Sequence, residues 1–290
     1  RPSAIMPKFL VRPEAIDADR VVFDHDETHH LARVLRLGPG ELVRATDGRG
    51  TEYTVRLESV SPKGAQGTIL ARSSRPTESP CAITLAQSVP KGEKMEWIVR
   101  AATELGVARV RPLLTERCVV QLEPGRWHER ARRWQRVAKE AAKQCGRSVI
   151  PTVEPPTTLT EFLDQGPAAD LALCLWEGEP QGLREILGAI RAPIGSALLV
   201  VGPEGGLTSG EVAALRAHGF ASASLGPRIL RAETAGPAAV SILQSSFGDL
   251  GAGRDDAQNL FERGLGPRNP SGGGSEGGQS PPPRYRDAAE

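Results

Sequence analysis

A glycine-rich segment directly follows the most apolar stretch of the sequence. Residues 197–201 are Ala-Leu-Leu-Val-Val, and the run Gly-Pro-Glu-Gly-Gly occupies residues 202–206. Open α/β sheets bind ligands at loops of this kind, beyond the carboxyl ends of parallel strands, and glycines let backbone groups approach a ligand closely. The segment therefore predicts a binding loop, and a turn that merely ends the strand is the alternative.

A second segment of the same character follows further along the chain. The run Leu-Gly-Pro-Arg-Ile-Leu-Arg at residues 225–231 comes after a short apolar stretch and before a helix of small residues near Ala235. Small residues permit close approach between chain segments. We expect the two loops to form one ligand site, since parallel strands end at the same edge of a sheet.

Most other chemical signatures are absent. There is no Walker loop, no Gly-x-Gly-x-x-Gly and no Gly-x-Ser-x-Gly, and His128-Glu129 lacks the second histidine of a zinc protease. The four cysteines are too widely spaced for a zinc pair or a compact disulfide framework; they are Cys81, Cys118, Cys145 and Cys174. We therefore expect no metal site and small buried thiols.

The hydropathy pattern excludes a membrane span. No run reaches the roughly 18 apolar residues that such a helix needs, and the first six residues lack the apolar core of a signal peptide. We therefore expect a cytoplasmic protein with no membrane partner.

The net charge of +1 hides two opposite blocks. Residues 81–150 contain 14 Lys and Arg against 7 Asp and Glu, whereas residues 151–250 contain 5 against 11. A basic block followed by an acidic one predicts that one face binds a polyanion while another holds a different ligand.

The first part of the chain predicts a small β-barrel over residues 6–75. Residues 20–23, 41–44 and 52–57 alternate apolar and polar side chains, as half-buried strands do. Between the first two, Leu31, Val34 and Leu35 share one helical stripe. Residues 72–80 have the composition of a linker.

From residue 81 the pattern alternates between strand and helix. Strands are expected at 83–86, 107–114, 171–176, 197–201 and 223–225, with helices at 93–105, 127–145, 182–190, 209–218 and 234–247. This alternation predicts an α/β domain over 81–250 with a largely parallel sheet. Residues 251–290, with 9 Gly and 5 Pro, are expected to be a disordered tail.

Several motifs together resemble one known family. The loops at 202–206 and 225–231, followed by Glu233-Thr234-Ala235, resemble the RsmE-type 16S rRNA (uracil-N3)-methyltransferases of the SPOUT superfamily. Segments 30–38, 87–96, 104–106, 116–118 and 144–147 resemble the same family, and the match spans residues 6–251. The family more often has threonine where this chain has Ala232, so we assign Ala232 no polar role.

The resemblance implies a fold and a cofactor. It implies a PUA-like RNA-binding barrel joined to a SPOUT domain with a C-terminal deep trefoil knot, S-adenosylmethionine as cofactor, and a homodimer that acts on 16S rRNA of the small ribosomal subunit. The family's cofactor lies among three loops, which correspond here to Leu175, Trp176, Glu177, Leu199, Gly202, Pro203, Glu204, Gly205, Gly206, Leu225, Gly226, Ile229 and Leu230.

Methylation of uridine N3 needs loss of a proton, so we expect positioning and electrostatics to dominate. Arg231 is expected to stabilise the uridine anion, and Glu204 to orient the substrate or act as base. For Arg231 the alternatives are binding of an RNA phosphate or an ion pair with Glu233. For Glu204 the alternative is a carboxylate that caps the following turn. We expect Trp127 and Trp134 to pack in a core or dimer interface.

Nine cations are expected to contact RNA phosphates, although a solvated helix face is the alternative for each. They are Arg33, Arg36, Lys91, Lys94, Arg117, Arg136, Lys139, Lys143 and Arg147. Two other functions stay open at this point: a SPOUT methyltransferase that acts on tRNA, and a non-catalytic RNA-binding ribosome-assembly factor.

Overall fold

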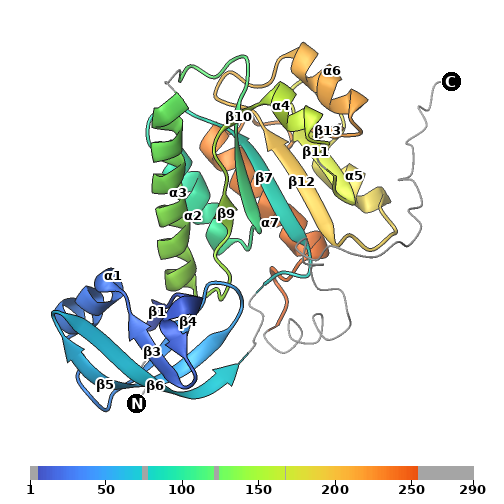
Figure 1. The fold of residues 1–290 in the computed structure, drawn as a ribbon. Coiled ribbons are helices and arrows are strands. Elements are labelled where there is room, and N and C mark those ends of the chain that lie inside the picture. Colours follow the sequence, from blue (N-terminus) through green and yellow to red (C-terminus); the bar gives the residue numbers. More distant parts are fainter. Residues whose placement is uncertain (1–5, 74–77, 121–123, 167, 254–290) are drawn as a thin grey trace.

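Two sheets organise the chain (Figure 1). The computed structural model describes residues 6–73, 78–120, 124–166 and 168–253. Most of the tail expected at 251–290 therefore lies outside the described residues. No helix in the described part of the chain is long and apolar enough to cross a membrane.

The N-terminal sheet has six strands and curls around its own core. In spatial order the strands are β1 (Lys8–Leu10), β4 (Leu42–Thr46), β5 (Glu52–Ser61), β6 (Gly64–Ser73), β3 (Arg20–Phe23) and β2 (Ile16–Asp17), with a 3₁₀ turn at Pro13–Ala15. Burial alternates along β3, as its sequence predicts. The expected barrel is thus a curled sheet, because among the described residues its edge strands β1 and β2 do not pair.

The helix after β3 differs from the expected one. It begins as α1 (His25–His29) and continues as a π-helix over His30–Val34, in which Leu35 N–H donates to His30 C=O at 3.0 Å. Leu31 is buried, but Val34 is 60% and Leu35 39% exposed, so the expected three-residue stripe was wrong. The wider π turn rotates the later residues away from the α-helical stripe.

The C-terminal sheet is parallel throughout, which confirms the α/β prediction. Its strands in spatial order are β10 (Thr157–Thr158), β8 (Arg109–Leu114), β7 (Ala82–Ser88), β12 (Ser196–Val201), β11 (Leu171–Leu175) and β13 (Ala221–Ala223), and β9 (Thr152–Val153) also pairs with β8. The trefoil knot stays a prediction.

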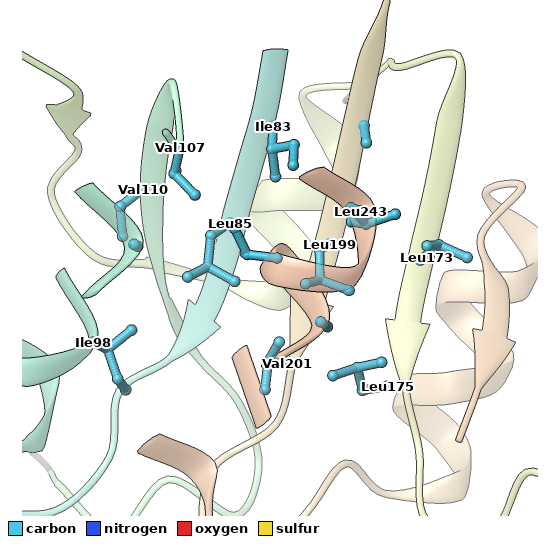
Figure 2. Packing of buried hydrophobic residues seen from close by; sticks show 14 of the residues in the cluster. Ile83, Leu85, Ile98, Val107, Val110, Leu173, Leu175, Leu199, Val201 and Leu243 are labelled. Atoms are coloured by element: carbon cyan, nitrogen blue, oxygen red, sulfur yellow. The ribbon is translucent and has the colours of Figure 1, made fainter. Parts of the chain in front are cut away.

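Helices cover both faces of this sheet. They are α2 (Lys94–Glu104), α3 (Pro124–Cys145), α4 (Leu159–Asp164), α5 (Leu183–Ala189), α6 (Ser209–Ala217) and α7 (Ala232–Phe247). One core cluster joins the sheet to α2, α3, α5 and α7, and a second joins it to α4 and α6. Figure 2 shows Leu243 of α7 beside Leu199 of β12. Trp127 and Trp134 are buried in the first cluster, which confirms their packing role.

Polar contacts join the N-terminal domain to the C-terminal domain at the carboxyl end of α3. Lys8 of β1 forms a buried ion pair with Glu52 and donates to the carbonyls of Gly146 and Arg147 at 2.9 and 3.0 Å. Lys143 of α3 lies 2.8 Å from Glu27 of α1. These contacts fix the N-terminal sheet against the carboxyl end of α3.

Candidate functional site

Three loops at the carboxyl edge of the parallel sheet enclose a cavity of about 510 Å³. The loops follow β11, β12 and β13, as the strand-end rule predicts. Predicted cofactor residues that line it are Leu175, Trp176, Glu177, Gly202, Gly206, Leu225, Gly226, Ile229 and Leu230.

Four predicted cofactor residues do not line this cavity. Leu199 is fully buried in the middle of β12, where it pairs with Leu173 and Leu85, so it is a core residue. Pro203, Glu204 and Gly205 belong to the glycine-rich loop but are absent from the cavity wall. The physical reason is the tight turn after β12, in which the Gly206 N–H donates to the Pro203 carbonyl at 2.9 Å, so that only Gly202 and Gly206 line the cavity.

Glycine is required at both cavity-facing positions of this turn. Gly206 has φ +71°, and a β-carbon there would lie 2.5 Å from Glu177 Oε1. A β-carbon on Gly202 would lie 2.9 Å from the backbone nitrogen of Leu207. The turn therefore brings the loop after β12 against the loop after β11 without intervening side chains.

A buried polar anchor supports the opposite wall of the cavity. Glu179 accepts hydrogen bonds from the Ser222 hydroxyl and the Arg216 guanidinium. Burial alone would raise the pKa of Glu179, but these donors and the Gln181 N–H outweigh it and hold the pKa below its ordinary value. Glu179 is therefore an ionised carboxylate in the cavity wall.

Pro227 and Arg228 also line the cavity, within the loop that the sequence predicted, whereas sequence reasoning missed Glu179, Pro180, Gly182, Val201, Ala223, Ser224, Ala232 and Ala235. Most follow a predicted strand end, so the rule that found their neighbours could have included them. Arg228 is exposed at the rim, whereas Ala232 is buried, in keeping with its expected lack of a polar role.

Four charged side chains lie together next to this cavity. Lys94 Nζ lies 2.9 Å from Glu204 Oε1 and 3.2 Å from Glu233 Oε2, and Arg231 Nη1 lies 4.0 Å from Glu233 Oε1. Burial alone would raise the pKa of Glu204, but hydrogen bonds from Lys94 and the Lys91 N–H hold that pKa below its ordinary value. The hydrogen bond to Glu204 likewise raises the pKa of Lys94.

The structure distributes the nine expected RNA contacts over three regions. Lys91, Lys94 and Arg117 surround the glycine-rich loop, and Arg117 donates to the Gly205 carbonyl at 2.7 Å. Arg33 and Arg36 lie after α1 in the N-terminal domain. The remaining four lie on α3 or just beyond it: Arg136, Lys139, Lys143 and Arg147.

Arg147 was wrongly expected to contact RNA. Its side chain is 4% exposed, pairs with Glu78, and donates to the carbonyls of Thr103 and Val107 at 3.0 and 2.8 Å. Its four side-chain hydrogen bonds all run to protein acceptors, namely the Glu78 carboxylate and the two carbonyls. Arg147 is therefore a structural residue.

The cavity suits a ligand that is partly apolar and partly cationic. Leucine, valine, isoleucine and alanine side chains contribute to its wall, and Glu177 and Glu179 add carboxylates. Gly202, Gly206 and Gly226 line the cavity without side chains, which leaves room for close approach to main-chain groups.

Comparison with known protein families covers both domains. Residues 77–244 match the model of an RNA methyltransferase domain, and residues 23–70 match the model of an RNA methyltransferase PUA domain. Two proteins named ribosomal RNA small subunit methyltransferase E are similar in sequence. The Bacillus subtilis protein is 33% identical, covering 78% of this chain and 90% of its own; the Synechocystis protein is 37% identical, covering 79% and 74%.

Solved structures agree with these matches. A ribosomal RNA small subunit methyltransferase E from Neisseria gonorrhoeae, bound to S-adenosyl methionine, is 36% identical with a TM-score of 0.76, over 84% of this chain and 99% of its own. A methyltransferase from Legionella pneumophila in complex with the same cofactor is 33% identical, with a TM-score of 0.77 and the same coverage.

Proposed function

The chain belongs to the ribosomal RNA small subunit methyltransferase E family, and on that premise we propose that it methylates N3 of a uridine in 16S rRNA, with S-adenosylmethionine as methyl donor. The observation that carries this proposal is the glycine-lined cavity at the ends of β11, β12 and β13, with Arg231 next to its wall residues Leu230 and Ala232. A ribosomal RNA substrate would place the protein in the cytoplasm.

The cavity residues fit the proposed cofactor. S-adenosylmethionine, when bound, supplies an activated methyl group on a positively charged sulfur. Glu177 would provide negative charge for such a ligand, whereas Glu179 is paired with Arg216, and the apolar wall would hold the ring system. Glycine at positions 202 and 206 keeps this side of the cavity free of side chains.

Arg231 supplies electrostatic stabilisation in this mechanism. Its side chain is 83% exposed, and it precedes Ala232, the first residue of α7, so its guanidinium is available at the cavity. When uridine N3 loses its proton, the uracil ring becomes negatively charged, and a guanidinium nearby lowers the energy of that anion. The carboxylate of Glu204 is held ionised by Lys94, so its lowered pKa favours orienting the substrate over accepting a proton.

The exposed face of α3 supports an RNA-binding role. Five arginines line an open surface hollow of about 870 Å³ along this helix together with Glu129 and Gln135; they are Arg126, Arg130, Arg132, Arg133 and Arg136. Arg133 pairs with Glu93 and Glu96, whereas Arg126, Arg132 and Arg136 make no ion pair within the described residues. We propose that these three arginines contact RNA phosphates, since such contacts supply most of the affinity for nucleic acids.

We propose that the remaining predicted cations contribute to the same surface to different degrees. Arg33, Arg36, Lys91 and Arg117 are candidates for phosphate contacts near the substrate. Lys139 and Lys143 lie close to Glu27, which partly neutralises them. A phosphate that approaches the two lysines would compete with this carboxylate.

We also propose a homodimer. Trp97 of α2 is 47% exposed and Ile242 of α7 is 38% exposed, and these two helices pack against each other. Large apolar side chains exposed on neighbouring helices are typical of a surface that another protein covers. Sedimentation of the purified chain tests this: a dimer is expected, and substitution of both residues by serine is expected to shift it toward monomer.

Identification of the methylated nucleoside tests the proposed function. The chain is incubated with labelled S-adenosylmethionine and small ribosomal subunits that lack uridine-N3 methylation, and the RNA is digested to nucleosides. Labelled N3-methyluridine is the expected product. Label found only when tRNA is supplied would support the tRNA alternative, and cofactor binding without label in any RNA would contradict methyl transfer.

A further inference from the structure

Four side chains of alternating charge form a row of ion pairs beside the cavity, which we call the ion-pair row. In order they are Glu204, Lys94, Glu233 and Arg231, and the successive nitrogen–oxygen separations are 2.9, 3.2 and 4.0 Å. Lys94 is the second member and contacts both carboxylates. The ion-pair row therefore ends at Arg231, the cation that the proposed function assigns to the substrate.

The ion-pair row joins three separate elements of the fold. Glu204 belongs to the loop after β12, Lys94 is the first residue of α2, and Glu233 lies in the first turn of α7. Glu204 also accepts from the Lys91 N–H at 3.1 Å, which ties the loop after β7 to the loop after β12. The four charged side chains thus connect these elements next to the cavity.

The two carboxylates depend on Lys94. Glu233 Oε2 is buried and makes no hydrogen bond among the described residues, so the ammonium group of Lys94 at 3.2 Å is the charge that compensates it. Without Lys94, the carboxylates of Glu204 and Glu233 would face each other across the vacated space. Like charges in one site raise the pKa of one carboxyl group and push the two side chains apart.

Arg231 in turn depends on Glu233. Its guanidinium is largely exposed, and Glu233 Oε1 at 4.0 Å is its ion-pair partner within the described residues. No hydrogen bond joins the two groups at this distance, so Glu233 acts on Arg231 by electrostatic attraction. The guanidinium is therefore drawn toward Glu233 with its donors left for a ligand.

We infer that Lys94 and Glu233 are positioning residues for methyl transfer: Lys94 fixes the Glu233 carboxylate, and Glu233 orients the guanidinium of Arg231 toward the uridine. This inference rests on the proposed function, because it requires Arg231 to act on the substrate. It also gives Lys94, which was expected to contact RNA phosphates, a role inside the site.

Kinetics of four variants test this inference, namely Lys94→Met, Lys94→Arg, Glu233→Gln and the double variant Lys94→Met/Glu233→Gln. Each is assayed with small subunits for kcat, for KM, and for S-adenosylmethionine affinity. Lys94→Met and Glu233→Gln are expected to lower kcat by about 10- to 100-fold, since a catalytic group displaced by about 1 Å costs about 100-fold. KM and cofactor affinity are expected to change little.

Two further signatures separate positioning from a general structural effect. Lys94→Arg is expected to keep most of the wild-type kcat. The double variant is expected to lose no more kcat than the worse single variant, because both changes interrupt the same ion-pair row. The acid limb of kcat against pH is expected to move to higher pH in Lys94→Met, since Glu204 loses the hydrogen bond from Lys94 that holds its pKa below the ordinary value. Lys63→Met, on the turn between β5 and β6, controls for loss of one lysine.

Three results would overturn the inference. A raised KM with a reduced salt dependence and an intact kcat in Lys94→Met would make Lys94 a phosphate contact. Unchanged kinetics in Lys94→Met and Glu233→Gln would remove any role, and additive losses in the double variant would mean that the two act separately. Absence of N3-methyluridine with the wild-type chain is a separate result, which would contradict the proposed function itself.

Discussion

Gly206 lies so close to Glu177 that a β-carbon at position 206 would be 2.5 Å from the Oε1 atom of that carboxylate. The two residues come from the loops after β12 and β11, and both line the cavity. Glu177 is exposed and its flexible side chain can move aside, so the need for glycine at position 206 rests on the backbone. Gly206 also has φ +71°, a conformation that residues with a β-carbon rarely adopt.

Gly206→Ala is therefore expected to weaken binding of S-adenosylmethionine by at least about 10-fold, because a β-carbon at this positive φ strains the turn that lines the cavity. Isothermal titration measures this affinity directly. Gly188→Ala is the matched control, since Gly188 lies in α5 with open space where a β-carbon would be. Equal affinity in Gly206→Ala and the wild type would contradict the placement of the cofactor in this cavity.

Glu179 predicts a specific pH dependence of stability. Its pKa in the folded chain is below its ordinary value of 4.5, so the stability it contributes is present above that value and is lost as pH falls through the folded pKa. Glu179→Gln is expected to destabilise the chain by about 1–2 kcal/mol at pH 7. Thermal unfolding as a function of pH should show this difference shrinking below about pH 4.5, whereas a constant difference would exclude the charge of Glu179 as its cause.

The arginines of α3 predict a salt-dependent effect on RNA affinity. Replacement of Arg126, Arg132 and Arg136 together by glutamine is expected to weaken binding to small-subunit RNA and to lower the slope of log affinity against log salt by about 0.7–0.9 per contact. Cofactor affinity is expected to stay unchanged. Replacement of Arg184 and Arg191, exposed cations of the acidic block, is the matched control. An unchanged salt slope would remove α3 from the RNA-binding surface.

Arg147 predicts a stability effect in place of an RNA effect. Arg147→Ala is expected to destabilise the chain by about 3–5 kcal/mol, because it takes the guanidinium away from Glu78 and from two buried carbonyls. Arg136→Ala, at an exposed position of the same region, is expected to change stability by less than about 0.5 kcal/mol. Chemical denaturation compares the two; similar stabilities would contradict the structural role of Arg147.

Local sequence predicted much of the parallel sheet and the cavity. Apolar runs that end in glycine marked β12 and its loop, and the helix expected at 209–218 is α6, which begins with a capping box between Thr208 and Glu211. β6 escaped prediction because its sequence contains Gly64 and Gly67, which have low strand propensity. Pairing with β5 and β3 stabilises it, and the tight contact of Gly67 with Arg56 explains the second glycine.

Long-range relationships were beyond sequence patterns. Nothing in the spacing of Lys94, Glu204 and Glu233 indicates that one ammonium group contacts two carboxylates, because three different elements bring them together. The burial of Arg147 likewise depends on the chain's return to Glu78 and to the end of α2. Such contacts result from tertiary packing, which a single sequence does not reveal.

Single-turnover methylation of small ribosomal subunits by the wild type, Arg231→Lys and Arg231→Ala tests the central claim most directly. With saturating cofactor and RNA, the wild type is expected to form N3-methyluridine, and Arg231→Ala is expected to form it at least about 100-fold more slowly. Arg231→Lys, which keeps the charge but not the planar donors, is expected to react at an intermediate rate. Cofactor affinity should be the same in all three. Equal rates in the three proteins would contradict the assignment of Arg231 to the uridine anion.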